Sequence, residues 1–246
     1  MGKLYTSRIM PTTASATSAA SGYPATNALL QSIGVPWRAA NATQNDLIID
    51  LGSAQTVAGI GLTDINALSP VIASSADNVT YTDRATPTFT ADRFGRVRGV
   101  APVASISARY WRIRFPAGTP TDGAAYFKAG AVYVFGAVAT VLNPEYAMNV
   151  ETQHAESRET LANGGIAIAA IGNRFDAVSG KLRLDASVSM GSILPGLRQG
   201  VVWLDLELST RTWWSWPLIN NAGADRESLE NPAQANVDLN AREVVR

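Results

Sequence analysis

Few side chains in this sequence could carry out a reaction. His154 is the only histidine, so a Ser–His–Asp triad would have to include it, yet no nucleophile motif lies beside it and no Gly-x-Ser-x-Gly elbow occurs. The chain has no cysteine, which excludes thiol nucleophiles, disulfides and thiolate metal sites. The acidic residues are scattered and do not predict the carboxylate pair that glycoside hydrolysis needs. The sequence therefore predicts a protein that is not an enzyme and that uses no cofactor or metal.

Trp37 and Arg38 are the first candidates for binding a ligand. An indole ring offers a flat apolar surface, and a guanidinium beside it offers a fork of hydrogen-bond donors. Packing in the core of a domain is the favoured alternative for Trp37. We predict both residues as ligand-binding, with that alternative open.

The densest aromatic patch of the chain is Trp213-Trp214-Ser215-Trp216, with Arg211 close by. On a strand, Trp214 and Trp216 would lie on one face and Trp213 on the other. Three uses fit such a patch: the core of a domain, a subunit interface, whose anchors are enriched in Trp and Arg, or a platform for a sugar ring. We predict Arg211, Trp213, Trp214 and Trp216 as interface residues, with the other two uses as alternatives.

The charge balance excludes two classes of partner. Twenty basic and twenty acidic residues give no net charge, so we expect no binding to nucleic acid, and the arginines of the 93–98 segment and of 112–114 are predicted to be solvated or salt-bridged. The longest apolar run, residues 166–171, is far shorter than the roughly 20 residues that cross a bilayer, so no membrane insertion is expected. The first residues lack the apolar core of a secretory signal, which predicts synthesis in the cytosol.

These residues must be positioned by strands, because the hydrophobic pattern is almost everywhere that of β-structure. Residues 47–51 form an apolar run ended by Gly52, and residues 57–62 follow after a short turn. Residues 110–115 alternate, with Trp111, Ile113 and Phe115 on one face and Arg112 and Arg114 on the other. Residues 130–136 are predicted as the last strand of a first domain, and residues 202–219 as a hairpin turning at 209–212.

The same pattern divides the chain into four parts. Residues 1–22 are predicted as an N-terminal arm and residues 23–137 as a β-sandwich. Residues 138–219 are predicted as a β-rich assembly domain. Residues 220–246 are predicted as a polar C-terminal arm with a short helix near 226–230.

Five segments of the first domain occur in an order that resembles a known family. The segments are Tyr23-Pro24-Ala25-Thr26-Asn27-Ala28, Pro36-Trp37-Arg38, residues 46–52 ending in Asp50-Leu51-Gly52, residues 74–81, and Ala108-Arg109-Tyr110-Trp111-Arg112-Ile113-Arg114-Phe115. This order resembles the discoidin domain, or coagulation-factor type C domain, one of the galactose-binding-like jelly rolls. The resemblance implies an all-β protein: a galactose-binding-like jelly-roll β-sandwich followed by a second, smaller β-rich domain.

The resemblance also implies where a partner would bind. Such domains bind sugars, lipids or proteins through loops at one end of the sandwich, which here are residues 32–42, 67–70 and 83–87. The family often shows Ala-x-Asp-Gly near a calcium site, whereas this chain has Ala25-Thr26-Asn27-Ala28. The carboxylate is lost, so the calcium site is not expected here.

Cysteine-free versions without a signal and with Pro-Trp-Arg-Ala-Ala-Asn look like those in structural proteins of tailed bacteriophages. That likeness implies a non-enzymatic virion component of the distal tail, baseplate or tail tip, assembled in the cytoplasm of the host bacterium. Its partners would be further copies of itself, other phage tail proteins and host surface glycans. The alternative is a free or receptor-binding carbohydrate-binding module, which loss of sugar binding in Trp37→Ala or Trp214→Ala would favour. A glycan-processing enzyme is the third hypothesis.

Overall fold

The computed structural model describes residues 2–30, 34–91, 97–141, 148–160, 166–185, 201–206, 215–220, 227–231 and 234–243. These residues form antiparallel β-strands and one 3-10 turn, η1 (Ala25–Leu29), so the all-β fold class predicted from the sequence is confirmed. The strands of the first part are β1 (Gly2–Ile9), β2 (Thr13–Ala16), β3 (Trp37–Arg38), β4 (Asn45–Ile65), β5 (Val71–Ser75), β6 (Thr82–Ala85), β7 (Val97–Phe115), β8 (Lys128–Ala129) and β9 (Ala131–Val141). Those that follow are β10 (Met148–Thr160), β11 (Ile166–Asp185), β12 (Val201–Leu206), β13 (Ser215–Asn220), β14 (Glu227–Asn231) and β15 (Gln234–Glu243).

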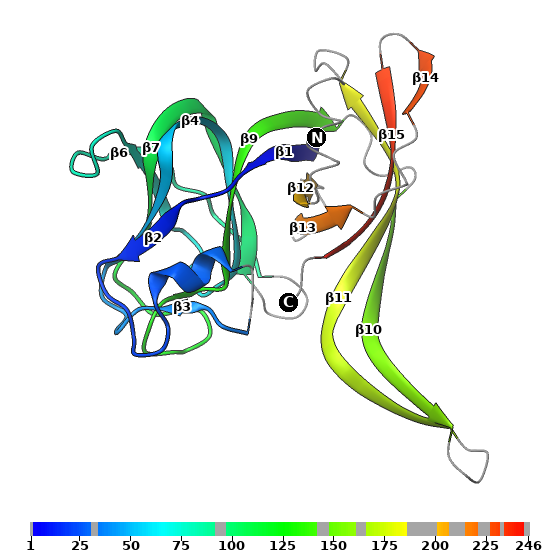
Figure 1. Ribbon diagram of the computed structural model, residues 1–246, viewed down its shortest axis with the longest axis horizontal. Coiled ribbons are helices and arrows are strands. Elements are labelled where there is room, and N and C mark those ends of the chain that lie inside the picture. Colours follow the sequence, from blue (N-terminus) through cyan, green and yellow to red (C-terminus); the bar gives the residue numbers. More distant parts are fainter. Residues whose placement is uncertain are drawn as a thin grey trace.

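The β-sandwich is built around two long strands, β4 and β7, that pair with each other over both of their halves. Residues 45–50 of β4 pair with residues 110–115 of β7, and residues 55–65 pair with residues 97–108. The register shifts between Asp50 and Gln55, where Gly52 has a φ of 78°, which favours glycine. The first half of β4 also pairs with β2 and the second half with β9, so the two halves of β4 lie in different layers of the sandwich (Figure 1). Strand β7 spans both layers too, because it pairs with both halves of β4.

The core lies between these layers. Leu47 and Ile49 from the first half of β4 and Ile60 and Leu62 from its second half are fully buried in one hydrophobic cluster. Trp111, Ile113 and Phe115 of β7 are also fully buried there, and Arg112 and Arg114 lie on the opposite face of the strand, partly exposed. The predicted alternation of β7 is therefore confirmed, and its buried face is worth several kcal/mol at about 25 cal/mol per Å² of apolar surface.

The N-terminal arm predicted over residues 1–22 is wrong, because most of that segment is paired sheet. Strand β1 pairs with β9 on one side and with β12 on the other, and Leu4 and Tyr5 are fully buried. Strand β2 pairs with β4. The partners of β1 lie more than a hundred residues further along the chain, so no local pattern of the first residues indicates the pairing.

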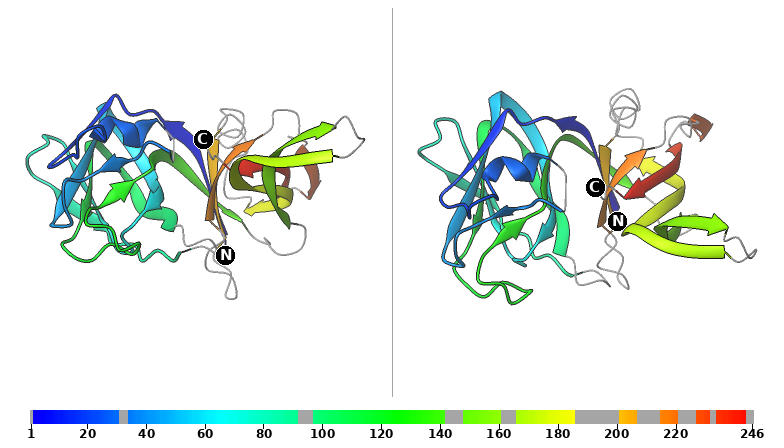
Figure 2. Two further views of the ribbon diagram at one scale, coloured as in Figure 1. Left: turned by 90° about the horizontal axis from the view of Figure 1, so that it is seen from below. Right: turned by 60° about the horizontal axis from the view of Figure 1, so that its bottom comes forward.

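Strands β10 to β15 continue the sheet beyond β1 in the order β12, β13, β15, β11, β10. Strands β12 and β13 pair with Leu204 opposite Trp216, which confirms the predicted hairpin on its described strands. Strand β9 runs through the boundary predicted at residues 137 and 138, and its Val141 pairs with Leu184 of β11. The two parts of the molecule are therefore linked through β1 and β9 (Figures 1 and 2).

The polar C-terminal arm predicted over residues 220–246 is also wrong over its described residues. Strand β15 lies between β11 and β13, and residues 227–231, where a short helix was expected, form strand β14. Backbone pairing across a sheet needs no apolar pattern, so a polar sequence with Asn and Pro can hide a strand.

Candidate functional site

Three loops meet at the end of the sandwich where β4 begins and β7 ends, which we call the apex. Backbone hydrogen bonds join them: Gly118 N–H donates to the Ala42 carbonyl at 3.4 Å, and Thr121 N–H to the Asn66 carbonyl at 2.9 Å. The segment after β6 reaches the same place, because Phe89 N–H donates to the Leu68 carbonyl at 2.8 Å. The described parts of the loops predicted at 32–42 and 67–70 thus lie together, and they are joined by a segment that the sequence did not predict, residues 116–127.

Asn66 fixes the segment of residues 116–127 to the end of β4. Its side chain is almost fully buried and donates to Asp122 Oδ1 at 3.0 Å and to the Tyr126 carbonyl at 2.9 Å. Its own Oδ1 accepts the Lys128 N–H at 2.8 Å. Burial alone raises the pKa of Asp122, but the hydrogen bonds from Asn66 and the Ala124 N–H lower it below its ordinary value. One side chain therefore holds the loop of residues 121–128 in a single arrangement.

Asn45 and Asn27 hold the other loops in the same way. The buried amide of Asn45 donates to the Thr43 carbonyl at 2.7 Å and accepts a hydrogen bond from the Ser18 hydroxyl. Asn27 is also buried and donates to the Pro36 carbonyl at 3.4 Å. Asn27 therefore clamps the loop that contains Pro36. Among the residues that the structure describes, no group of three His, Cys, Asp or Glu could hold a metal ion.

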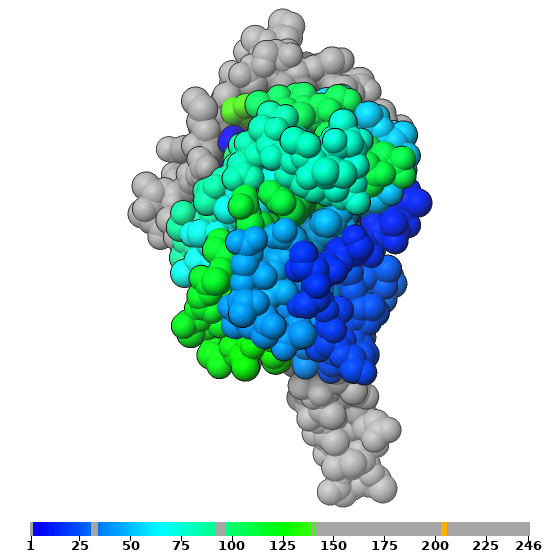
Figure 3. Space-filling model, turned by 90° about the vertical axis from the view of Figure 1, so that its left-hand side faces the viewer, coloured from blue at the N-terminus to red at the C-terminus, as the bar shows by residue number. Residues whose placement is uncertain are grey.

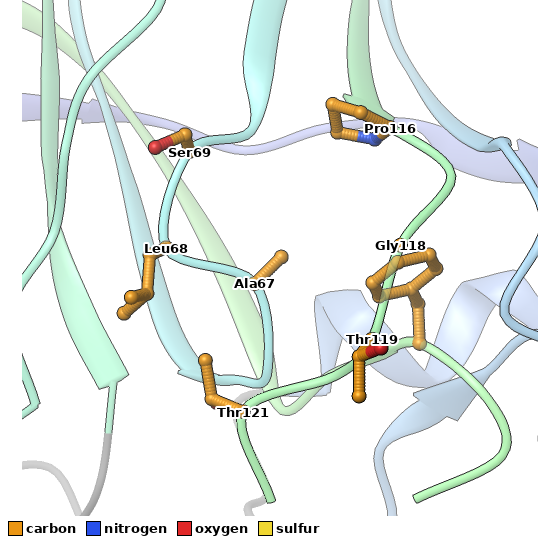
Figure 4. A pocket seen from close by; sticks show the side chains of 8 residues that line it. Ala67, Leu68, Ser69, Pro116, Gly118, Thr119 and Thr121 are labelled. Carbon is orange, nitrogen blue, oxygen red and sulfur yellow. The ribbon is translucent and has the colours of Figure 1, made fainter. Parts of the chain in front are cut away.

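Between the loops lies a cleft of about 230 Å³, which Figure 4 shows with its lining side chains. Residues of the β4–β5 loop form one wall, residues that follow β7 form the other, and Phe127 is the buried floor. The lining is uncharged, and its polar side chains are three hydroxyl groups. The lining residues are Ala67, Leu68, Ser69, Pro116, Gly118, Thr119, Thr121 and Phe127.

Trp37 supports this cleft from the core instead of contacting a ligand. Its side chain is fully buried, and its Nε1–H donates to the Ser18 carbonyl at 3.1 Å. Its ring centroid lies 5.4 Å from that of Phe115, which lies 5.6 Å from that of Phe127. The prediction of Trp37 as a ligand-binding residue is corrected, because a fully buried ring has no face to offer, and the core alternative is the one that the structure shows.

Arg38 lies at the surface of the apex, between two tyrosines. Its Cζ is 3.9 Å from the centroid of the Tyr23 ring and 5.2 Å from that of the Tyr126 ring. All three side chains are half-buried. The sequence singled out Arg38 but not the two tyrosines, because Tyr126 comes from a segment far along the chain. Figure 3 shows the surface formed by the N-terminal residues in blue, residues near 35–45 in lighter blue and residues near 120 in green.

The outer face of β7 carries arginines that are neutralised by acidic neighbours. Arg112 lies 3.7 Å from Asp46 and 3.8 Å from Asp83, and Arg114 lies 2.7 Å from Asp83. The Arg112 guanidinium also lies 4.3 Å from the centroid of the Tyr81 ring. This confirms the predicted salt bridges of Arg112 and Arg114 and gives the face no excess of positive charge.

The residues predicted to form a subunit interface fall largely outside the described part of the chain. Arg211, Trp213 and Trp214 lie outside it, and of Trp216 the structure describes only the backbone, in β13. Trp203 of β12 is the indole of this region whose surroundings are described. It is fully buried in a cluster with Tyr5 and Phe135.

Comparison with known proteins finds similar solved structures. No protein-family model and no curated protein sequence matches the chain. A chitosan-binding module of a chitosanase/glucanase from Paenibacillus sp. IK-5 is 26% identical, with a TM-score of 0.45, over 54% of this chain and all of that module. A family 32 carbohydrate-binding module of NanJ from C. perfringens, in complex with galactose, is 22% identical with a TM-score of 0.44, over 54% of this chain and 98% of its own. A further module from Clostridium perfringens, in complex with GalNAc-β-1,3-galactose, is 13% identical with a TM-score of 0.45, over 52% of this chain and 99% of its own.

No helix among the described residues is long and apolar enough to cross a membrane.

Proposed function

We propose that the β-sandwich is a non-catalytic carbohydrate-binding module and that its apex cleft holds one saccharide unit. The observation that carries the proposal is the cleft itself. It combines apolar surface from Ala67, Leu68 and Pro116 with the hydroxyls of Ser69 and Thr119, and its lining carries no charge. A sugar presents C–H surface and hydroxyl groups together, so both kinds of lining have a counterpart in the ligand.

The size and the rigidity of the cleft support the same function. Its volume of about 230 Å³ is below the roughly 300–1,000 Å³ of pockets for drug-sized ligands, which suits one sugar ring better than a longer chain. Asn66 and Asn45 fix the loops before any ligand arrives, which lowers the entropy lost on binding. The modules that are similar in structure are named for chitosan, galactose and a GalNAc disaccharide, but the proposal for this chain stands on the cleft.

A blocking substitution tests the proposal. A Cβ added at Gly118 would meet no atom closer than 4.0 Å, so Gly118→Trp is expected to fold and to fill the cleft. The matched control is Ala117→Trp, at an exposed neighbouring position that does not line the cleft. Glycans found on an array with the unaltered protein are titrated by calorimetry. We expect Gly118→Trp to weaken binding by more than about tenfold, or about 1.4 kcal/mol, and the control to bind normally. Failure of the unaltered protein to bind any glycan, or unchanged binding by Gly118→Trp, would contradict the proposal.

A second candidate function is assembly with further copies of the chain, as the likeness to bacteriophage tail proteins implies. The long β10–β11 hairpin favours it. Strand β11 pairs with β15 only from Ala177 onward, and β10 is the last strand of the sheet order. Most of the hairpin therefore extends beyond the sheet (Figure 1), and the outer edge of β10 has no strand partner in the described part of the chain. Such an edge can pair with another chain.

Mass measurement in solution tests this second candidate. Replacing residues 153–175 with an Asn-Gly turn removes the extended part and keeps the pairing of β10 with β11 at Thr152 and Asp176. We expect the unaltered chain to be an oligomer and the shortened chain to be a monomer. A role in a virion tail is a proposal that requires the first of these results, and a monomeric unaltered chain would count against it.

A further inference from the structure

We propose that Arg38, Tyr23 and Tyr126 form a carboxylate-binding subsite at the apex, so that the module prefers acidic saccharides over neutral ones. This inference rests on the proposed function, because it assigns the substrate class of the same end of the sandwich. The cleft carries no charge of its own and cannot select an acidic sugar. A group that selects acidic over neutral saccharides would therefore have to lie beside the cleft.

The guanidinium of Arg38 is held in one place by its neighbours. The Tyr23 and Tyr126 rings lie 3.9 Å and 5.2 Å from its Cζ, both within the roughly 6 Å of a cation–π interaction. Its backbone is fixed as well, because the Arg38 carbonyl accepts the Ala20 N–H at 2.8 Å and β3 pairs with β8. An arginine fixed in this way loses little side-chain entropy when it binds an anion.

The donors of Arg38 are divided between the interior and the surface. Its Nε is buried and has no hydrogen-bond partner among the described residues. Its two Nη atoms are not buried, and no hydrogen bond or ion pair within the described part of the chain engages them. The edge of the guanidinium that carries both Nη groups is therefore the edge that faces solvent. This edge can donate two parallel hydrogen bonds to a carboxylate.

The acidic residues near Arg38 are occupied by another cation. Lys128, which pairs with Arg38 across β3 and β8, has its ammonium 3.2 Å from Asp64 and 3.4 Å from Asp122. Asp122 also accepts the hydrogen bond from Asn66. Neither carboxylate is paired with Arg38, so a ligand carboxylate would not have to displace an ion pair of Arg38 within the described part of the chain.

The subsite and the cleft share one segment. The Tyr126 ring lies beside Arg38, and the next residue, Phe127, forms the floor of the cleft. The Phe127 carbonyl accepts the Ala39 N–H at 2.8 Å. The proposal requires a saccharide that reaches both places, with a sugar ring in the cleft and a carboxylate at Arg38. The ligand class is an oligosaccharide that contains a uronic or sialic acid.

Matched pairs of acidic and neutral sugars test the inference. The probes are trigalacturonic acid against its trimethyl ester, a hyaluronan hexasaccharide against its methyl ester, and 3′-sialyllactose against lactose, each titrated by calorimetry. We expect at least one acid to bind about tenfold more tightly than its neutral partner at low salt, and this preference to shrink as NaCl is raised from about 0.02 to 0.5 M, because salt screens the charge.

Two variants identify the residue responsible. Arg38→Gln is expected to abolish the preference for the acid, and Arg38→Lys to restore part of it, because a lysine keeps the charge and loses the fork. The control is Arg109→Gln, at a partly exposed arginine of β7 whose Nε donates to Asp50 at 2.8 Å, which removes the same charge away from the apex. Circular dichroism and the melting temperature show that each variant is folded.

The outcomes separate this inference from the proposed function. If neutral glycans bind and no acid is preferred, or if the preference persists in Arg38→Gln, the carboxylate subsite is wrong and the carbohydrate-binding function stands. If no glycan of any kind binds, both are wrong. A preference that disappears equally in Arg109→Gln reflects overall charge and also overturns the subsite.

Discussion

The substitution Asn66→Ala tests whether one buried amide organises the apex. Asn66 makes three hydrogen bonds, to Asp122 Oδ1, the Tyr126 carbonyl and the Lys128 N–H, at 2.8–3.0 Å. Each is worth about 1 kcal/mol net, and leaving a buried donor or acceptor without a partner costs about 1–3 kcal/mol more. We expect Asn66→Ala to lower the free energy of unfolding by about 4 kcal/mol.

Urea unfolding measures that free energy, and amide hydrogen exchange locates the change. The Lys128 N–H loses its acceptor and should exchange faster, whereas amides in the centre of β4 should change less. The pKa of Asp122 should rise, because the hydrogen bond from Asn66 lowers it in the unaltered protein. The control is Gln55→Ala, at an exposed glutamine whose amide donates to the Ser53 hydroxyl at 2.9 Å, where about 1 kcal/mol or less is expected. Equal losses in Asn66→Ala and Gln55→Ala, or unchanged exchange at Lys128, would refute the reasoning.

Three further predictions concern the core, the sheet junction and a loop. Trp37→Ala should cost about 3–5 kcal/mol of stability in urea unfolding, as a fully buried ring does, and a loss of sugar binding without loss of stability would contradict its place in the core. Gly61→Ala should cost about 1–3 kcal/mol, because its Cβ would lie 2.5 Å from the buried Trp203 ring, whereas Gly118→Ala, with open space around its Cβ, should cost little. Asp77 should titrate in an NMR experiment at about pH 2, because backbone N–H groups of its loop bond its carboxylate. Since that folded-state pKa lies below the roughly 3.9 of an unfolded Asp, its contribution to stability is complete above about pH 4 and is lost as the pH falls toward 2, and Asp77→Asn should remove that part of the acid dependence. A midpoint near 4 would contradict it.

The sequence could predict the parts of the fold that are written in local alternation. Residues 110–115 alternate with a period of two, and the structure buries Trp111 and Ile113 while Arg112 stays partly exposed. The same holds for the hairpin of β12 and β13. Burial on one face selects these residues one by one, so their pattern is visible without the rest of the chain.

The sequence could not predict the elements whose partners are distant. Strand β1 is fixed by β9 and β12, and a short N-terminal strand cannot be told from an arm until those partners are known. Distance along the chain is also part of the reason why the sequence does not predict the candidate site. Asn66 reads as an ordinary loop residue, and its partners Asp122 and Tyr126 lie 56 and 60 residues away. The chemistry of their side chains makes both Trp37 and Arg38 candidates, but neighbouring residues on a strand point to opposite faces, and the structure buries Trp37 while Arg38 is partly exposed.

The position of β1 between β9 and β12 has a consequence for how the protein is made. The first strand leaves the ribosome before either neighbour exists, and its second edge stays unpaired until residues 201–206 have been synthesised. Bringing such distant segments together is slow, so the start of the chain is among the last pieces to dock.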